Sequence, residues 1–175
     1  MSLNIPESLL QLEANCGVFA LWLIVKQYHT HIDIADLIRL SGHDREDGTF
    51  TIALAVALKK LGFEVSFYTA PDPHIDEKEK QSYLDAQRLQ IPIQAALTYS
   101  EIQQAFEQGH FVIVFYDTLQ GMGNQSLIYS IDEHEISFCD HFDVMFKTVF
   151  EQQRQSDEIC RQVIVIQQPV DHYPI

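Results

Sequence analysis

One stretch near the N-terminus, NCGVFALWLIV at residues 15–25, constrains the fold more than any other part of the chain. The nine apolar or small residues after the cysteine are too few to cross a membrane, which takes about 20 helical residues. The run therefore predicts a buried helix from Cys16 to about Tyr28, with Asn15 as its N-cap. The stripe that this helix buries consists of Val18, Phe19, Leu21, Trp22, Leu23 and Val25. A cysteine in the first turn of such a helix is either a nucleophile or an ordinary core residue.

Apolar periodicity and end signals place further elements along the chain. Helices are expected at residues 32–42, 51–61, 77–89, 100–109 and 143–155, and strands at 63–69, 110–117, 125–132, 135–140 and 160–167. Asp33 and Gly42 bound the first of these helices, Gly62 is a natural C-cap, and Ser100 with Gln103 forms a capping-box pattern. The strand at 110–117 has almost no polar interruption, which is typical of a central strand.

This order of elements indicates the fold class. Helices come first and mostly antiparallel strands follow, including a hairpin at residues 125–140, so the chain is predicted to be α+β. No stretch has the composition of a linker, so residues 1–175 are expected to form a single domain with a tail at 168–175.

The charge limits the classes of partner. A formal net charge of −14 disfavours nucleic-acid phosphates and acidic lipid surfaces, and it favours basic partners such as basic peptides. The three cysteines form no CxxC pair, and the first residues carry no signal-peptide pattern. We therefore expect a reducing, cytoplasmic setting with no disulfide framework, in which Cys139 and Cys160 are packing residues.

A cysteine nucleophile needs partners that the chain must supply. The thiolate attacks, a histidine takes and returns the proton, and an Asp or Asn orients that histidine. Donors such as a glutamine amide must also face the developing oxyanion. An early cysteine helix followed much later by a hairpin is the chain order of papain-like enzymes. Gln11 precedes Cys16 by five residues, and Asp140 closes the second hairpin strand.

On these residues the sequence resembles the bacteriocin-leader-processing cysteine peptidases, the double-glycine-leader branch of the papain-like superfamily. The cysteine motif of that family is similar to QLEANCG at residues 11–17. Over about residues 8–166 the chain is also similar to guanylyl-cyclase-domain proteins of the same fold, in the segments EIQQAFEQGHFVIVFY and GNQSLIYSIDEHEISFCDHF. The resemblance implies a papain-like fold, with N-terminal helices, the first headed by Cys16, packed on a C-terminal sheet.

The same resemblance exposes departures from the family pattern. The histidine position falls on Asn124, and a slip of one residue places it on Gln125; neither amide can act as a general base. Asp140 matches the orienting acid, but His141 replaces the usual proline after it. Gln11 lies one residue closer to the cysteine than the family spacing, which puts its oxyanion role in doubt.

Other histidines are candidates for the missing base. His110 opens the strand at 110–117, and His141 lies beside Asp140. His134 is expected to be an exposed turn residue. The pair His29 and His31 is expected to be solvated at a helix end, although two histidines at this spacing in a strand are able to bind a metal ion. We read the loop around GHDRED as polar, and we expect neither a metal nor a cofactor.

Three functions remain open at this stage. The first is a degenerate peptidase relative that binds a polypeptide in the old cleft by strand addition and apolar pockets. The second is an active cysteine peptidase that uses Cys16 with His110 or His141 as an unusual base. The third is nucleotide chemistry, which only the guanylyl-cyclase-like resemblance suggests, because the chain has no P-loop pattern. The sequence does not indicate the oligomeric state.

Overall fold

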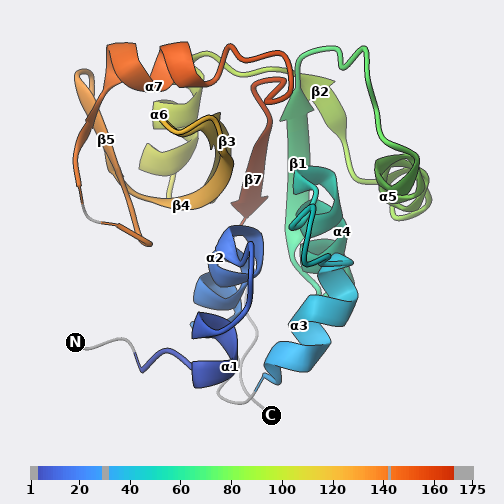
Figure 1. The fold of residues 1–175 in the computed structure, drawn as a ribbon. Helices are drawn as coiled ribbons and strands as arrows, with labels where there is room; N and C mark the ends of the chain where they lie inside the picture. The colour runs from blue at the N-terminus through green and yellow to red at the C-terminus, as the bar shows by residue number, and fades with distance from the viewer. Residues whose placement is uncertain (1–3, 29–31, 142, 168–175) are drawn as a thin grey trace.

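A computed structural model describes residues 4–28, 32–141 and 143–167. The helices are α1 (Glu7–Leu10), α2 (Cys16–Val25), α3 (Ile34–Ser41), α4 (Thr51–Lys60), α5 (Glu77–Arg88), α6 (Tyr99–Glu107) and α7 (Lys147–Gln153). The strands are β1 (Glu64–Thr69), β2 (Ile93–Ala95), β3 (Phe111–Asp117), β4 (Gly123–Ile131), β5 (Glu135–Phe138), β6 (Met145–Phe146) and β7 (Val163–Gln167). The predicted α+β class is confirmed, and Figure 1 shows α1 to α4 gathered at one end of the molecule. No helix in the described ranges is long and apolar enough to span a membrane.

The cysteine helix begins at the predicted residue but differs from the prediction in its surroundings. Eight of the ten residues of α2 are buried, so the helix is covered on nearly all sides instead of along one stripe. Asn15 precedes the helix in a helical conformation, and its side chain makes no cap. Its amide donates instead to the carbonyl of Leu9, at 2.8 Å, which ties the start of α2 to the unpredicted short helix α1.

The predicted helix ends were right for α3 and wrong for α6. The Asp33 side chain accepts from the backbone N–H of Ala35, and Gly42 ends α3 with a positive φ of 61°. The capping box of α6 is formed by Thr98 and Glu101, not by Ser100 and Gln103. A carboxylate accepts from the N-cap backbone more strongly than a neutral amide does, which favours the earlier start.

The strands form one seven-stranded sheet in the order β2-β1-β7-β3-β4-β5-β6. Only β1 and β2 are parallel, and the remaining neighbours are antiparallel. The predicted central position of β3 is confirmed, because β7 and β4 flank it. The two edge strands, of three and two residues, were not predicted. Residues 143–155, predicted as one helix, instead divide into β6 and the shorter α7.

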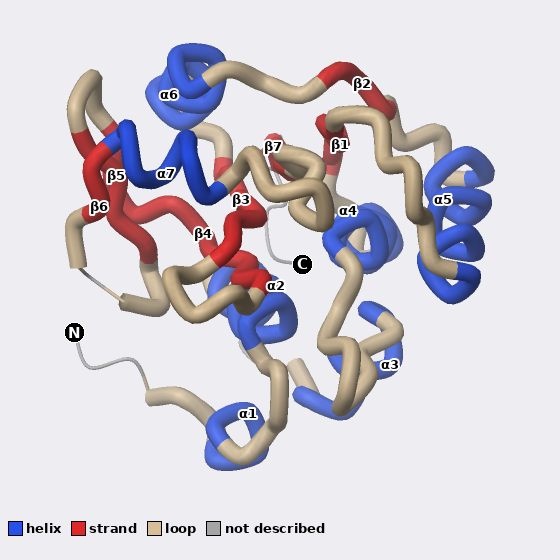
Figure 2. The backbone as a smooth tube through the Cα atoms, turned by 45° about the horizontal axis from the view of Figure 1, so that its top comes forward, coloured by secondary structure: helices blue, strands red, loops and turns tan. Residues whose placement is uncertain are grey.

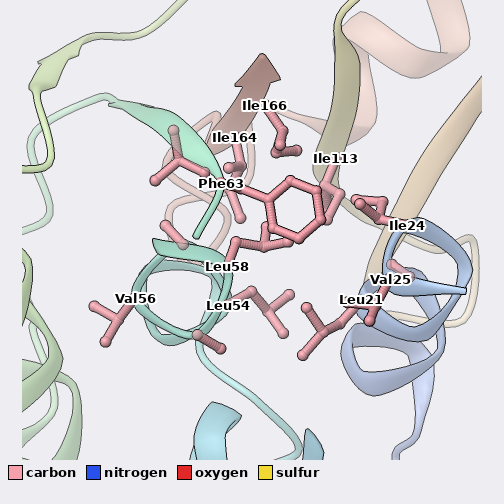
Figure 3. Packing of buried hydrophobic residues seen from close by; sticks show 14 of the residues in the cluster. Leu21, Ile24, Val25, Leu54, Val56, Leu58, Phe63, Ile113, Ile164 and Ile166 are labelled. Carbon is pink, nitrogen blue, oxygen red and sulfur yellow. The ribbon is translucent and has the colours of Figure 1, made fainter. Parts of the chain in front are cut away.

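Helices cover both faces of this sheet, as Figure 2 shows with the top of the molecule tilted toward the viewer. One core lies between the sheet and α2, α3 and α4, and Figure 3 shows the ring of Phe63 among side chains of α2, α4, β3 and β7. The second core lies between the sheet and α6 and α7, with Tyr116 stacked on Phe138 at 5.0 Å between ring centroids. Because β4 contributes Leu127 to the first core and Ile128 to the second, neighbouring residues of this strand face opposite sides of the sheet.

Helix α5 carries a buried carboxyl group. Glu79 is 5% exposed, and the structure gives it no ion pair with the lysines and arginines that it describes. Burial raises the pKa of this carboxyl, and the nearby carboxylates of Asp72 and Asp76 raise it further. Hydrogen bonds from the Gln162 side chain and the Asp76 backbone oppose this rise without cancelling it. The fold therefore favours the protonated form of Glu79 more than the unfolded chain does.

Because the pKa of Glu79 is raised in the folded state, the contribution of its protonated side chain to stability depends on pH. The contribution is complete below the ordinary glutamate pKa, about 4.3, and it is lost as the pH rises through the native pKa of Glu79. Glu79→Gln keeps the shape and removes the ionisation, so the melting temperature of the variant should exceed that of the wild type by a few degrees at pH 8 and by little at pH 4. Thermal melts at both pH values test this, with Glu77→Gln, on the same helix but exposed, as the control. An equal gap at both pH values would contradict it.

Candidate functional site

The thiol of Cys16 lies half-buried at the start of α2, where this helix meets β4. Its Sγ donates a hydrogen bond to Oε1 of Gln125, at 3.3 Å. The two residues lie 109 positions apart in the sequence, so the fold brings them together. Among the described residues, no histidine makes a hydrogen bond to this sulfur.

The orientation of the Gln125 amide is fixed by its other partners. Nε2 donates to the carbonyl oxygen of Thr49, at 2.6 Å, and to Oγ1 of Thr51, at 3.2 Å. Because a backbone carbonyl only accepts, the amide must present its NH2 group to Thr49 and its oxygen to Cys16. Gln125 is 4% exposed, so no water competes freely for these groups. The thiol is thereby held as a proton donor.

The close contact between the start of α2 and Gln125 explains why a glycine follows the cysteine. A Cβ built on Gly17 would lie 2.8 Å from Oε1 of Gln125 and 3.2 Å from side-chain carbons of Thr49 and Leu54. Any side chain at this position would push the glutamine away from the sulfur or separate α2 from α4. The pair Cys16–Gly17 in the sequence therefore reflects contact with Gln125.

The electrostatic environment keeps this thiol protonated. Burial raises the pKa of Cys16 above its ordinary value, and the charge of Asp140 adds to the rise. Hydrogen bonds from the backbone of Gln125, Gly17 and Cys16 favour the thiolate but are weaker than the effect of burial. The positive end of a helix dipole lowers the pKa of a thiol, and in this structure burial outweighs that effect.

The predicted histidine position, Asn124, faces away from the thiol. Strand β4 alternates, so Asn124 and Ser126 point to the side of the sheet opposite Gln125. The Asn124 amide donates to the Tyr116 hydroxyl, at 2.9 Å, and to Ser126 Oγ, at 3.0 Å. The amide of β4 that contacts the thiol is therefore that of Gln125, the position reached by the one-residue slip, and not that of Asn124.

Asp140 lies with Asn124 and not with the thiol pair. Its Oδ2 accepts from Ser126 Oγ, at 3.0 Å, and from the Asn124 amide, at 3.4 Å. The same oxygen lies 3.1 Å from Nδ1 of His141. Asp140 and His141 thus form a pair on the α7 side of the sheet, and no hydrogen bond joins either of them to Gln125 or to Cys16 in the described residues.

The other predicted partners also lie apart from the sulfur. Gln11 is exposed, and its amide donates to Glu7, at 2.9 Å, so it does not face Cys16. His110 precedes β3. Phe115 of β3 pairs with Gln125 of β4, and His110 lies five residues before Phe115. Five residues of extended chain span about 17 Å, so His110 lies far from Gln125 and the thiol. His134 is exposed in the hairpin turn, as predicted. His29 and His31 lie outside the described residues.

Sequence reasoning missed the loop that holds the site together. His43 Nε2 donates to the carbonyl of Glu13, at 3.0 Å, and Nδ1 lies 2.9 Å from Oγ1 of Thr49. Burial lowers the pKa of this histidine, which suits a neutral ring that accepts from the Thr49 hydroxyl. His43 thus links the segment before Cys16 to the residue that orients Gln125. The only sequence signal for this loop was its polar, glycine-containing composition.

The remaining cysteines show the properties of packing residues. Burial raises the pKa of Cys139 to about 11 and that of Cys160 to about 11. The sulfur of Cys160 donates to the carbonyl of Asp157, at 3.1 Å. In the described part of the chain, no group of three or more histidine, cysteine or acidic side chains is placed to hold a metal ion.

Comparisons with known proteins agree with this architecture. The model of the Peptidase C39 family matches residues 8–128, which include Cys16 and Gln125 and end before Asp140. Over 103 residues the chain is 31% identical to the lactococcin-G-processing and transport ATP-binding protein LagD of Lactococcus lactis subsp. lactis. That match covers 59% of this chain and 12% of LagD, so the chain spans a small part of this relative.

A solved structure supports the fold. The peptidase domain of Streptococcus ComA, described as a bifunctional ABC transporter of a quorum-sensing pathway, aligns with a TM-score of 0.50 and 20% identity. The alignment covers 86% of this chain and 89% of that domain. The family match extends over more than half of the sequence and includes the cysteine helix, and it confirms the resemblance to papain-like bacteriocin-processing peptidases. This chain belongs to the Peptidase C39 family.

Proposed function

We propose that this chain is a Peptidase C39 domain that does not cleave peptide bonds and that binds a polypeptide segment. The observation that carries the proposal is the hydrogen bond from the Cys16 thiol to the Gln125 amide oxygen. A neutral amide does not take up a proton in the physiological range, so it cannot generate the thiolate or return the proton to a leaving group. The residues that surround the thiol instead stabilise its protonated form.

Support for retained peptide binding comes from the fold and the charge. The family match covers the segment that contains Cys16, and the thiol contacts the Gln125 amide where a cysteine peptidase needs a proton acceptor. LagD, the relative that matches over 103 residues, is named for processing lactococcin G. The net charge of −14 favours a partner with basic residues. A polypeptide with cationic side chains is therefore the ligand class that we assign to this domain.

Alkylation of Cys16 tests the loss of catalysis. Because the pKa of this thiol is raised, its thiolate fraction at pH 7 is below that of an ordinary cysteine, which is a few per cent. Iodoacetamide should therefore label Cys16 in the folded protein more slowly than in the same chain unfolded in urea, with the rate rising steadily up to pH 9. Mass spectrometry of the peptide that contains Cys16 gives both rates. Labelling at pH 6 that is faster in the folded chain would favour an active cysteine peptidase.

Binding requires a separate measurement. The chain, fluorescently labelled at its N-terminus, is applied to an array of synthetic 15-residue peptides of varied composition. We expect reversible binding to a subset of these peptides, and we expect Cys16→Ala to bind the same subset. A wild type that binds none of them would refute peptide binding, and loss of binding in Cys16→Ala would indicate covalent capture by the thiol.

A further inference from the structure

An open pocket of about 750 Å³ lies on the α7 side of the sheet, where Asn124 and its hydrogen-bond partner Tyr116 line it. Its walls come from the turn between β3 and β4, from residues 143–146, and from Val149 and Gln153 of α7. This volume lies in the range of ligand-binding sites, about 300–1,000 Å³. Neither Cys16 nor Gln125 lines the pocket, because Asn124, the residue of β4 that does, faces the opposite side of the sheet.

Apolar side chains are exposed around this pocket. Leu119 is 91% exposed, Met122 58%, Val144 56% and Phe146 65%. Exposed apolar residues scattered singly are normal on protein surfaces, but here four of the exposed large apolar residues line one pocket. Covering such side chains with apolar groups of a partner removes their surface from water and therefore favours binding.

The charges around the pocket have one sign. Asp143 lines the pocket, and Asp140 lies behind it, bonded to His141, which also lines it. No lysine or arginine is among the described lining residues. Together with the net charge of the chain, this arrangement attracts cations and repels acidic ligands.

We propose that this pocket is where the domain binds its polypeptide, and that the bound segment places a lysine or arginine next to bulky apolar residues. This inference rests on the proposed function and adds its location and the chemistry of the partner. It places recognition on the face of β4 that carries Asn124, apart from the thiol. The cation faces Asp143, and the apolar neighbours cover Phe146 and Met122.

Paired variants on the same array of 15-residue peptides test the proposal. Wild-type binding should concentrate on peptides that combine Lys or Arg with Leu, Ile or Phe. Phe146→Ser and Asp143→Lys should each weaken binding to those peptides about tenfold or more, as expected for a central apolar contact or a charge reversal. Two controls make the same kinds of change outside the pocket. Leu84→Ser removes an exposed apolar side chain of α5, and Glu133→Lys reverses a charge in the exposed hairpin turn. Both should leave the affinity unchanged.

The outcomes separate this inference from the proposed function. Wild-type binding that persists in Phe146→Ser and Asp143→Lys, or that selects acidic peptides, overturns the inference and leaves peptide binding by the domain intact. Binding that is lost equally in the pocket variants and in their controls also overturns it, because the pocket would then have no special role. A wild type that binds no peptide on the array refutes both. Circular dichroism of each variant confirms that an affinity loss is not unfolding.

Discussion

Gln125→His is expected to raise the rate of Cys16 alkylation by iodoacetamide at pH 7 by about tenfold or more. A histidine at this position would place a ring nitrogen near the present amide oxygen, which lies 3.3 Å from the sulfur. An imidazolium next to a thiol lowers the thiol pKa, and each unit of that lowering increases the thiolate fraction about tenfold in the range where the thiol form dominates. Mass spectrometry of the alkylated chain distinguishes Cys16 from Cys139 and Cys160.

The surroundings of Gln125 suit an imidazole. The Thr49 carbonyl, which now accepts from Nε2 at 2.6 Å, would accept the second ring N–H and hold the ring toward the sulfur. This carbonyl would take over the orienting role that an acid has in cysteine peptidases. The Asp140 carboxylate, bonded to Ser126 and His141 on the other side of the sheet, cannot do so.

Asn124→His is the matched control. It introduces the same side chain one residue earlier on β4, where the sheet separates it from the thiol. Cys16 alkylation in this variant should equal that of the wild type. Faster alkylation in Asn124→His than in Gln125→His would show that β4 has the alternative register in which Asn124 faces the cysteine.

A reactive thiol alone should not restore cleavage. The side chain predicted to donate to an oxyanion, Gln11, is exposed and bonded to Glu7. Removing one oxyanion donor from a protease costs about 100-fold to 1,000-fold in turnover. We therefore expect Gln125→His to react with small alkylating agents while the peptides that it binds stay intact. The proposed absence of cleavage would then rest on two missing components, the general base and the oxyanion donor.

The contrast between Asn124 and Gln125 shows what the sequence can and cannot predict here. The cysteine helix, the central strand and the late hairpin follow from local patterns, because apolar periodicity and cap residues act within a few positions. Which of two adjacent amides faces the thiol depends on strand register. A shift of one residue reverses the faces of the whole strand, and the register is set by pairing with β3.

The protonation state of the Cys16 thiol could not be predicted from local sequence patterns either. A cysteine in the first turn of a helix suggests a low pKa, but the sign of the shift is decided by burial of the sulfur. That burial comes from α4, β4 and the loop with His43 and Thr49, which lie between 27 and 109 residues away in sequence. The short edge strands β2 and β6 were missed for a related reason, since two or three residues are too few for a periodic pattern.

Arg154 is the position where a single substitution should destabilise the fold most. Its side chain is 0% exposed, and Nη1 lies 2.8 Å from Oε1 of Glu151. Nη2 donates to the carbonyls of Leu97, at 3.0 Å, and Arg161, at 3.3 Å. The guanidinium therefore joins α7 to the start of α6 and to the turn before β7. Burial lowers the pKa of this group, and Glu151 opposes the shift by stabilising the charged form.

Arg154→Met should lower the free energy of unfolding by about 3–5 kcal/mol, the usual cost of removing one partner of a buried ion pair. Methionine keeps much of the apolar stem, so the loss reports on Glu151 and the two carbonyls left without donors. Arg39→Met is the matched control, because Arg39 also pairs with an acid three residues earlier, Asp36, but with its side chain 72% exposed. Exposed pairs contribute about 0–1 kcal/mol, so urea denaturation should separate the two variants clearly. If both lost less than about 1 kcal/mol, the buried guanidinium would not be the link between α6, α7 and β7 that its contacts indicate.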